Sequence, residues 1–247
     1  MTRIAVITGA TSGIGYEFAK VLSEDDSFDS LWLIGRRTEK LDFAKGVAVK
    51  ADLSTKEGLD IIAGKLSEDK PVIGLLINCA GLGFKGDLSD SSREQISSVI
   101  DVNCRALSGM ISICLPYMED GRSGIINIAS SAGFLPQPKF AVYAASKSYV
   151  ISLSRALHYE LRPRHIQVTC ICPGPVITDF IPRSSGGDTE LTGIKKLTAK
   201  KPDEVAARSL AAYKRGRKVY SCGISQKLLR LASKIIPLDW ILMTIKW

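Results

Sequence analysis

Tyr143 and Lys147 form a pair that could carry acid–base chemistry. They are four positions apart in a segment with helical patterning, so their side chains share one face of a helix. A phenol ordinarily titrates near ~10, and a neighbouring ammonium group favours the phenolate and so lowers that pKa. A tyrosine tuned in this way can donate a proton to a carbonyl oxygen or accept one from an alcohol. Many helices carry this spacing by chance, so the interpretation depends on the residues around it.

Ser130 supplies part of that context. It directly follows the apolar run 125–129 and precedes Tyr143 by thirteen residues. The ends of parallel strands border the ligand crevice in open α/β sheets, so a hydroxyl there could hold a substrate oxygen beside the tyrosine. The adjacent Ser131 stays an alternative, although the spacing favours Ser130. The sequence contains no G-x-S-x-G motif, which argues against a serine hydrolase.

A glycine-rich turn follows the first apolar run, Ile4–Ile7, and precedes a helical segment. It has the form T-G-x-x-x-G-x-G, from Thr8 to Gly15. Glycines permit a tight turn and a close approach of the backbone, and the free N–H groups at a helix start can face a pyrophosphate. A purely structural turn is the alternative. The candidate phosphate contacts are Gly9, Thr11, Ser12, Gly13, Ile14 and Gly15.

Two further apolar runs end in residues that could select a dinucleotide. Arg36 and Arg37 follow the second run, where they would suit a 2′-phosphate through charge-assisted hydrogen bonds of roughly 1.5–3 kcal/mol each. NADP(H) is therefore the expected cofactor, and two solvated arginines are the alternative. Asp52 and Leu53 follow the third run, where a polar side chain could reach the adenine. Asp52 could equally cap the helix that begins near residues 54–55.

Short apolar runs alternate with longer helical segments along the chain. Runs that are apolar on consecutive positions are typical of parallel strands covered on both faces. The sequence therefore predicts a three-layer, doubly wound α/β fold of the Rossmann type, with a parallel sheet of about seven strands. The predicted strands are Ile4–Ile7, Leu31–Ile34, Val47–Val49, Val72–Ile77, Ile125–Ile128, Val168–Ile171 and Val219–Ser221. The predicted helices are Ile14–Glu24, Gly58–Leu66, Gln95–Met118 and Tyr143–Leu161.

No repeat or low-complexity linker divides the chain, so residues 1–225 are expected to form a single domain. The segment Pro182–Lys201 is rich in Gly, Ser, Thr and Lys, and we interpret residues 180–201 as a substrate lid. Residues 226–247 form an apolar and basic tail.

Composition narrows the function classes. The apolar run at the N-terminus is too short for a signal peptide or a membrane span. None of the six cysteines forms a C-x-x-C pair, so buried free thiols in a reducing, cytoplasmic setting are expected. The two histidines, His158 and His165, have no partner at ligand spacing, and no metal site is expected.

The net charge of +8 is concentrated at the C-terminus. Residues 195–247 contain thirteen Lys/Arg against three Asp/Glu, whereas the rest of the chain is slightly acidic. This region shows no recognised nucleic-acid module and few interleaved aromatics, so no nucleic-acid partner is expected.

Taken together, these motifs resemble the short-chain dehydrogenase/reductase family. The resemblance extends from residue 1 to about residue 180, with every motif in order and correctly spaced. The motifs are Thr8–Gly15, Asn78–Gly81, Ser130, Tyr143-x-x-x-Lys147 and Pro173–Thr178.

The resemblance implies roles for individual residues. Tyr143 would be the general acid/base, Lys147 would bind the nicotinamide ribose and lower the pKa of the tyrosine, and Ser130 would orient the substrate oxygen. Asn103 resembles a fourth catalytic residue, which holds a water in a proton relay to the lysine. Arg36 resembles the residue that selects NADP. The other implied cofactor-site residues are Asn78, which steadies the sheet, and Ala80, Gly81, Pro173, Gly174, Val176 and Thr178.

The implied activity is NADP(H)-dependent hydride transfer between nicotinamide and a small-molecule carbonyl or secondary alcohol. A catalytically weak, cofactor-binding regulatory protein is one alternative, and a peripheral membrane reductase of a lipid or steroid ketone is another. The C-terminal third lacks the Gly-rich ending of the 3-ketoacyl-carrier-protein reductases, which speaks against that subclass. A homodimer or homotetramer is expected, because family members pair the helices that correspond to 95–118 and 143–161.

The tail, residues 226–247, has three interpretations. Leu228, Leu231, Ile235 and Leu238 follow helical spacing, and Pro237 should break or kink the helix. The tail has no apolar run of the ~20 residues that a membrane span needs. It could pack beside the substrate pocket, reach across a subunit interface, or make a weak contact with an anionic membrane surface. Packing against protein is the preferred expectation.

Overall fold

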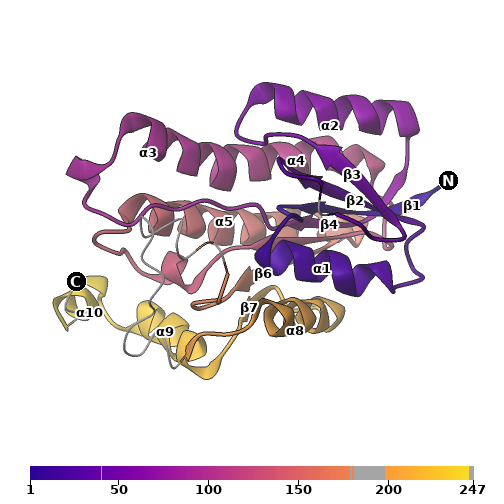
Figure 1. Cartoon of the computed structure of the whole chain (residues 1–247). Coiled ribbons are helices and arrows are strands. Elements are labelled where there is room, and N and C mark those ends of the chain that lie inside the picture. Colours follow the sequence, from indigo (N-terminus) through magenta and orange to yellow (C-terminus); the bar gives the residue numbers. More distant parts are fainter. Residues whose placement is uncertain (40, 179, 181–197, 245–247) are drawn as a thin grey trace.

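A central parallel sheet organises the structure, a computed structural model that describes residues 1–39, 41–178, 180 and 198–244 (Figure 1). Within these residues the sheet has seven strands in the order β3-β2-β1-β4-β5-β6-β7. The strands are β1 (Arg3–Thr8), β2 (Ser30–Gly35), β3 (Gly46–Lys50), β4 (Val72–Asn78), β5 (Gly124–Ile128), β6 (Gln167–Cys172) and β7 (Val219–Ser221). The predicted fold class and all seven predicted strands are confirmed. The order reverses between β1 and β4, the kind of position at which doubly wound sheets bind ligands.

Helices cover both faces of the sheet. One face carries α2 (Lys56–Asp69), α4 (Leu107–Cys114) and α5 (Ala141–Glu160), whose buried side chains pack on β1, β4 and β5. The other face carries α1 (Gly13–Ser23) and α8 (Pro202–Lys214). Because β4 is covered on both sides, all seven of its residues are buried. This explains the continuous apolar run in its sequence.

One long helical segment was predicted over Gln95–Met118. The structure divides it into α3 (Arg93–Ile100), a π-helical part (η2, Asp101–Ala106), α4 and a 3₁₀ turn (η3, Leu115–Tyr117). Together, residues 93–117 are long and apolar enough to span a membrane by length and composition alone, although 39% of the most apolar window is buried. Val99, Met110 and Cys114 lie in the core, as in a core helix of a globular protein.

The sequence did not predict α8. Its first position is Pro202, and acidic residues occupy its first turn, two signals that are typical of a helix start. Just before it, Lys200 forms an isolated parallel bridge with Val176. Most of the predicted lid, residues 181–197, lies outside the described residues.

The C-terminal tail is helical, as its spacing predicted. It forms α9 (Ile224–Ile235) and α10 (Leu238–Thr244), separated at Pro237. The remaining short 3₁₀ helices are η1 (Leu88–Asp90), η4 (Ser131–Phe134) and η5 (Arg162–Arg164). All six cysteines are free thiols. Among the described residues, no group of three or more His, Cys, Asp or Glu side chains could hold a metal ion.

Candidate active site

The glycine-rich turn brings three chain segments together at the carboxyl end of the sheet. Gly9 adopts φ +68°, and a Cβ there would lie 2.9 Å from the Ala80 backbone. Gly13 adopts φ +58°, and its Cβ would lie 3.1 Å from the Thr178 methyl group. A Cβ on Gly15 would clash with the Gly9 carbonyl oxygen. These positions therefore need glycine, and the turn lies against the segments that follow β4 and β6.

Thr8 connects two of these segments, a role that the sequence analysis missed. Its hydroxyl oxygen accepts hydrogen bonds from the backbone N–H groups of Cys79 (3.0 Å) and Ala80 (3.1 Å). The nearest sequence signal is that a threonine begins the T-G-x-x-x-G-x-G pattern. The bonds hold the end of β4 against the glycine turn.

The start of α1 has the chemistry of an anion site. Ser12 is the N-cap, but its side chain makes no capping hydrogen bond, and the first turn contains no acidic residue. Ile14 packs partly into the core beneath this turn. Thr11 packs against Gly35, where any Cβ would clash with the threonine methyl group. Uncapped N–H groups at a helix start favour a phosphate, so the turn fits the diphosphate of a dinucleotide.

Arg36 and Arg37 are exposed at the end of β2. Arg36 lies 3.8 Å from Asp52, and 70% of its side chain is exposed, so this ion pair holds it only weakly. Asp52 accepts hydrogen bonds from the Ser54 backbone (2.9 Å) and hydroxyl (2.7 Å). Burial alone would raise the pKa of Asp52, but these bonds and Arg36 lower it overall.

The helix cap next to this site is not Asp52. Thr55 caps α2 by accepting a hydrogen bond from the Gly58 N–H at 3.0 Å. Leu53 is buried beneath it. Arg36, Arg37 and Asp52 thus form a charged edge beside the glycine turn, and the two exposed arginines can bind a phosphate.

Ser130, Tyr143 and Lys147 come together from two elements. Ser130 follows β5, and its side chain lies close enough to the phenol of Tyr143, in the first turn of α5, to lower the pKa of that phenol. Lys147, one turn later, places its ammonium 5.7 Å from the centre of the Tyr143 ring. Ser131 instead lies in η4, where its backbone N–H donates to the Pro173 carbonyl at 2.8 Å. The geometry therefore favours Ser130 over Ser131 as the partner of the tyrosine.

The pKa of Tyr143 differs from the sequence-based expectation. We expected Lys147 to lower it, but burial raises it to about 12, and the interaction with the Ser130 side chain only partly opposes this effect. Burial also lowers the pKa of Lys147, whose ammonium donates to the Ile128 carbonyl at 3.0 Å. Desolvation is thus the largest cause of both shifts, and the phenol holds its proton across neutral pH.

Asn103 lies in the π-helical part η2 and is buried. Its side chain accepts a hydrogen bond from the Leu82 N–H and donates to the Leu82 carbonyl, both at 2.8 Å. It also donates to the Ser146 hydroxyl at 2.9 Å. A Cβ on Gly81 would lie 3.4 Å from the Lys147 ammonium and 3.6 Å from the Asn103 carbonyl oxygen. Asn103 and Lys147 therefore border the same small space.

Asn78 joins the sheet to α5 through a buried chain of polar groups. Its amide donates to Asn127 (2.9 Å), whose amide donates to Ser154 (3.0 Å). Its own carbonyl oxygen is buried without a partner among the described residues. The link supports the expectation that Asn78 steadies the central sheet.

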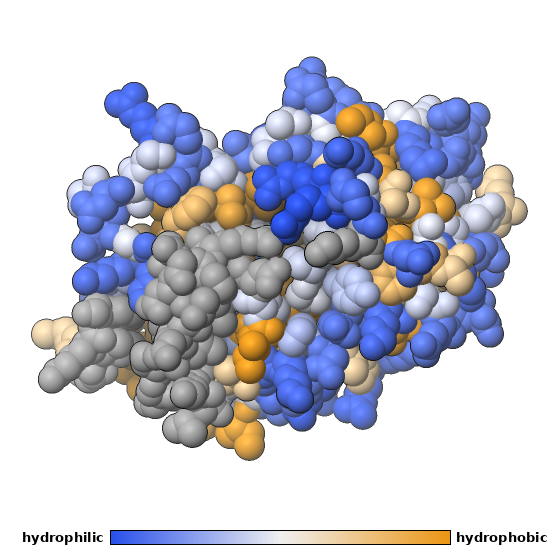
Figure 2. Space-filling view, viewed as in Figure 1, coloured by the Kyte–Doolittle hydropathy of each residue, from blue (hydrophilic) through white to orange (hydrophobic). Residues whose placement is uncertain are grey.

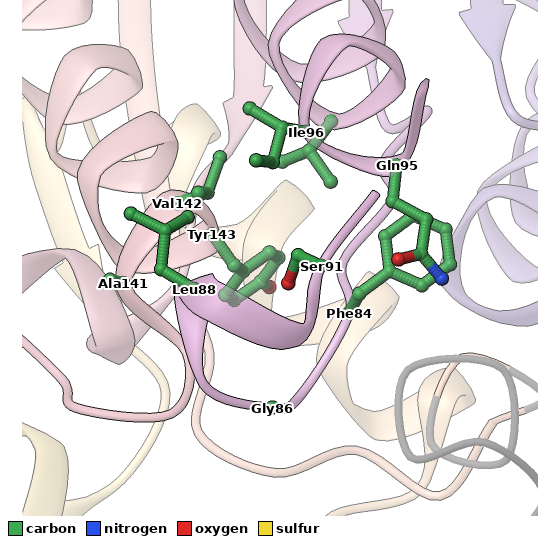
Figure 3. A pocket seen from close by; sticks show the side chains of 10 residues that line it. Phe84, Gly86, Leu88, Ser91, Gln95, Ile96, Ala141, Val142 and Tyr143 are labelled. Carbon is green, nitrogen blue, oxygen red and sulfur yellow. The ribbon is translucent and has the colours of Figure 1, made fainter. Parts of the chain in front are cut away.

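A small apolar pocket adjoins Tyr143 (Figure 3). It is lined by Phe84, Gly86, Leu88, Ser91, Gln95, Ile96, Val99, Ala141, Val142 and Tyr143. The Tyr143 ring also stacks on the ring of Phe140, with 4.3 Å between the ring centres, and its centre lies 5.4 Å from that of the Phe180 ring. Sequence reasoning identified none of these lining residues except Tyr143, because they come from separate elements. The surroundings of the phenol suit an apolar group.

The loop after β6 closes the site. Val176 is buried and pairs with Lys200, and Thr178 contacts Gly13 as described above. Gly174 lies so close to the Gln226 side chain that any Cβ would clash with it. Gln226, from the first turn of α9, is buried there. The tail thus contacts the predicted cofactor loop, a link that the sequence did not reveal.

Comparison with known proteins agrees with this geometry. Residues 3–186 match the family model for short chain dehydrogenases. The chain belongs to the short-chain dehydrogenase/reductase family. It is therefore an oxidoreductase by family, in a family that uses a nicotinamide cofactor.

Several known proteins are similar to most of the chain. An uncharacterized oxidoreductase of Staphylococcus epidermidis is 34% identical over 204 residues, which cover 80% of this chain and 86% of that protein. A 3-oxoacyl-[acyl-carrier-protein] reductase of Chlamydia muridarum is 30% identical, covering 85% and 89%. A solved short-chain dehydrogenase from Sphingobium yanoikuyae, in complex with NADPH, is 28% identical, with a TM-score of 0.82 and coverage of 99% and 96%.

Proposed function

We propose that the protein is an NADP(H)-dependent reductase of apolar ketones, with Tyr143 as the general acid. The observation that carries this proposal is the grouping of Ser130, Tyr143 and the buried Lys147, whose ammonium lies 5.7 Å from the centre of the Tyr143 ring, at the edge of the sheet that holds the glycine turn. The bound cofactor would supply the hydride to the carbonyl carbon of the substrate.

The residues of the chain would position the substrate oxygen and supply its proton. The Ser130 hydroxyl would hydrogen-bond the substrate oxygen and hold it beside Tyr143. The phenol, protonated across neutral pH because burial raises its pKa to about 12, would then donate its proton to that oxygen. Lys147 would stabilise the phenolate left behind, and Asn103 would hold the backbone beside it. In the reverse direction Tyr143 would take the proton from an alcohol.

Two features support the choice of ligands. The exposed guanidinium groups of Arg36 and Arg37 match a 2′-phosphate, and a similar short-chain dehydrogenase was solved with NADPH. The aromatic rings of Phe140 and Phe180 and the apolar pocket of Figure 3 favour a substrate with an apolar group beside its carbonyl.

The test is an assay of the full chain with NADPH against ketosteroids, acyl ketones, sugars and small ketones. We expect NADPH oxidation with at least one apolar ketone. Tyr143→Phe should reduce turnover of that substrate by about 100-fold or more, since a general acid contributes on that order, and should leave NADPH binding nearly unchanged. Tyr159→Phe, which alters an exposed tyrosine of the same helix, is the matched control. Near-normal turnover by Tyr143→Phe would overturn the assignment.

A further inference from the structure

The tail presents an apolar face to solvent. On α9, Ile224, Leu228, Leu231 and Ile235 are 77%, 62%, 55% and 71% exposed. Their spacing of three or four residues places them on one side of the helix. On α10, Trp240 and Met243 are also exposed. We call these six residues the tail face. Figure 1 places α9 and α10 at the lower left of the molecule, and Figure 2, viewed from the same side, shows only small apolar areas at that edge.

The helix α9 is attached to the domain by polar contacts. Gln226 is buried against Gly174, and Arg230 donates to the Val219 carbonyl at 3.1 Å. An amphipathic helix of a globular protein ordinarily buries its apolar side. Here the anchoring contacts hold the apolar side away from the core. The described residues of the chain therefore leave the tail face exposed, where another partner can bind it.

The charges near the tail face identify the kind of partner. Lys227 and Lys234 are exposed, one helical turn or less from Leu228, Leu231 and Ile235. The helix α9 contains no acidic residue. An apolar stripe with basic residues beside it is typical of a helix that lies in the interface of an anionic membrane. Tryptophan side chains also favour this interface between the headgroups and the acyl chains. Two copies of the tail face, meeting across a two-fold axis, would bring these lysines toward one another.

We propose that the tail face binds the surface of an anionic membrane, with α9 and α10 lying along the headgroup boundary. The apolar side chains would enter the outer acyl region, and the lysines would pair with lipid phosphates. Because Gln226, in the first turn of α9, packs on the loop after β6, the bound membrane would lie beside the candidate active site. The proposal does not depend on the proposed reaction.

The experiment measures flotation of the full chain with lipid vesicles. The vesicles are phosphatidylcholine alone, or phosphatidylcholine with about 30% phosphatidylglycerol. We expect binding to the anionic vesicles that is at least about tenfold tighter than to the neutral ones and that weakens with salt. Leu228→Glu should abolish binding, whereas Ile61→Glu, a matched change of an exposed apolar residue on α2, should preserve it.

A second pair of variants tests the charges. Lys227→Glu/Lys234→Glu should remove the preference for anionic vesicles. Arg215→Glu/Arg217→Glu, which changes the net charge equally at exposed positions after α8, should retain it. All of these side chains are exposed, and unchanged thermal unfolding will show that the variants fold.

Three outcomes would overturn the proposal. One is the absence of binding to anionic vesicles, and another is equal loss in the control variants. The third is dissociation of an oligomer by Leu228→Glu in light scattering, which would show that a second copy of the chain covers the tail face.

Discussion

The Ser130 side chain lies beside the Tyr143 phenol and lowers its pKa, although the two residues belong to different elements. Ser130 lies between β5 and η4, and Tyr143 lies in the first turn of α5, which packs back on the same sheet. Ser148, one residue past Lys147, donates to the Gly133 carbonyl at 2.7 Å and holds α5 against η4. The contact between α5 and η4 thus helps to position Tyr143 beside Ser130.

The raised pKa of Tyr143 predicts a pH dependence of stability. The folded protein binds this proton more tightly than the unfolded chain, so the stabilisation is fully present below pH ~10 and is lost as the pH rises toward about 12. Over that range the free energy of unfolding should fall by about 2–3 kcal/mol more in the wild type than in Tyr143→Phe. Urea unfolding of both proteins at several pH values measures the difference. Parallel curves would contradict it.

Arg36 should determine the choice of cofactor. We expect Arg36→Asp to raise the dissociation constant of NADPH at least about tenfold, since charge-assisted bonds to a 2′-phosphate would be lost, and to change that of NADH much less. Fluorescence titration with both cofactors measures this. Arg217→Asp alters an exposed arginine beyond α8 and serves as the control. Equal affinity of the wild type for NADPH and NADH would disprove the prediction.

Asn103 should stabilise the segment that contains Leu82. In Asn103→Ala, the Leu82 N–H and carbonyl lose their partners, and each unsatisfied group costs about 1–3 kcal/mol. The free energy of unfolding should therefore fall, as measured by urea denaturation. A double-mutant cycle with Ser146→Ala should show coupling above about 0.5 kcal/mol, because the two side chains are hydrogen-bonded. Strict additivity would mean that this bond contributes nothing.

The chain should form at least a homodimer through α4 and α5. Tyr149 is exposed on α5 and its hydroxyl lies 2.7 Å from that of Ser108 on α4, so the two helices share an outer surface. Tyr149→Arg should shift the protein toward the monomer in light scattering at micromolar concentration, because it places a charge in the interface. Leu228→Glu should remain dimeric. A monomeric wild type would refute the prediction.

The sequence by itself determined the local elements and the spacing of the site. Buried parallel strands require continuous apolar runs, which is why all seven strands were predicted within one or two residues of their observed bounds. The positive φ angles at Gly9 and Gly13 are local requirements of the turn, and the glycines at these positions indicate them in the sequence. Helix α8 was missed because its buried residues are mostly small, which weakens the apolar periodicity.

Only the tertiary structure decided how these parts meet. The direction of the Tyr143 pKa shift depends on burial by residues such as Phe140 and Phe180, which no spacing rule connects to it. The bonds between Asn103 and Leu82 join positions twenty-one residues apart. The spacing of α9 revealed an apolar stripe but not its direction. That direction was decided by Gln226 packing on Gly174, a contact between residues distant in the chain, and contacts of that kind exist only once the sheet has assembled.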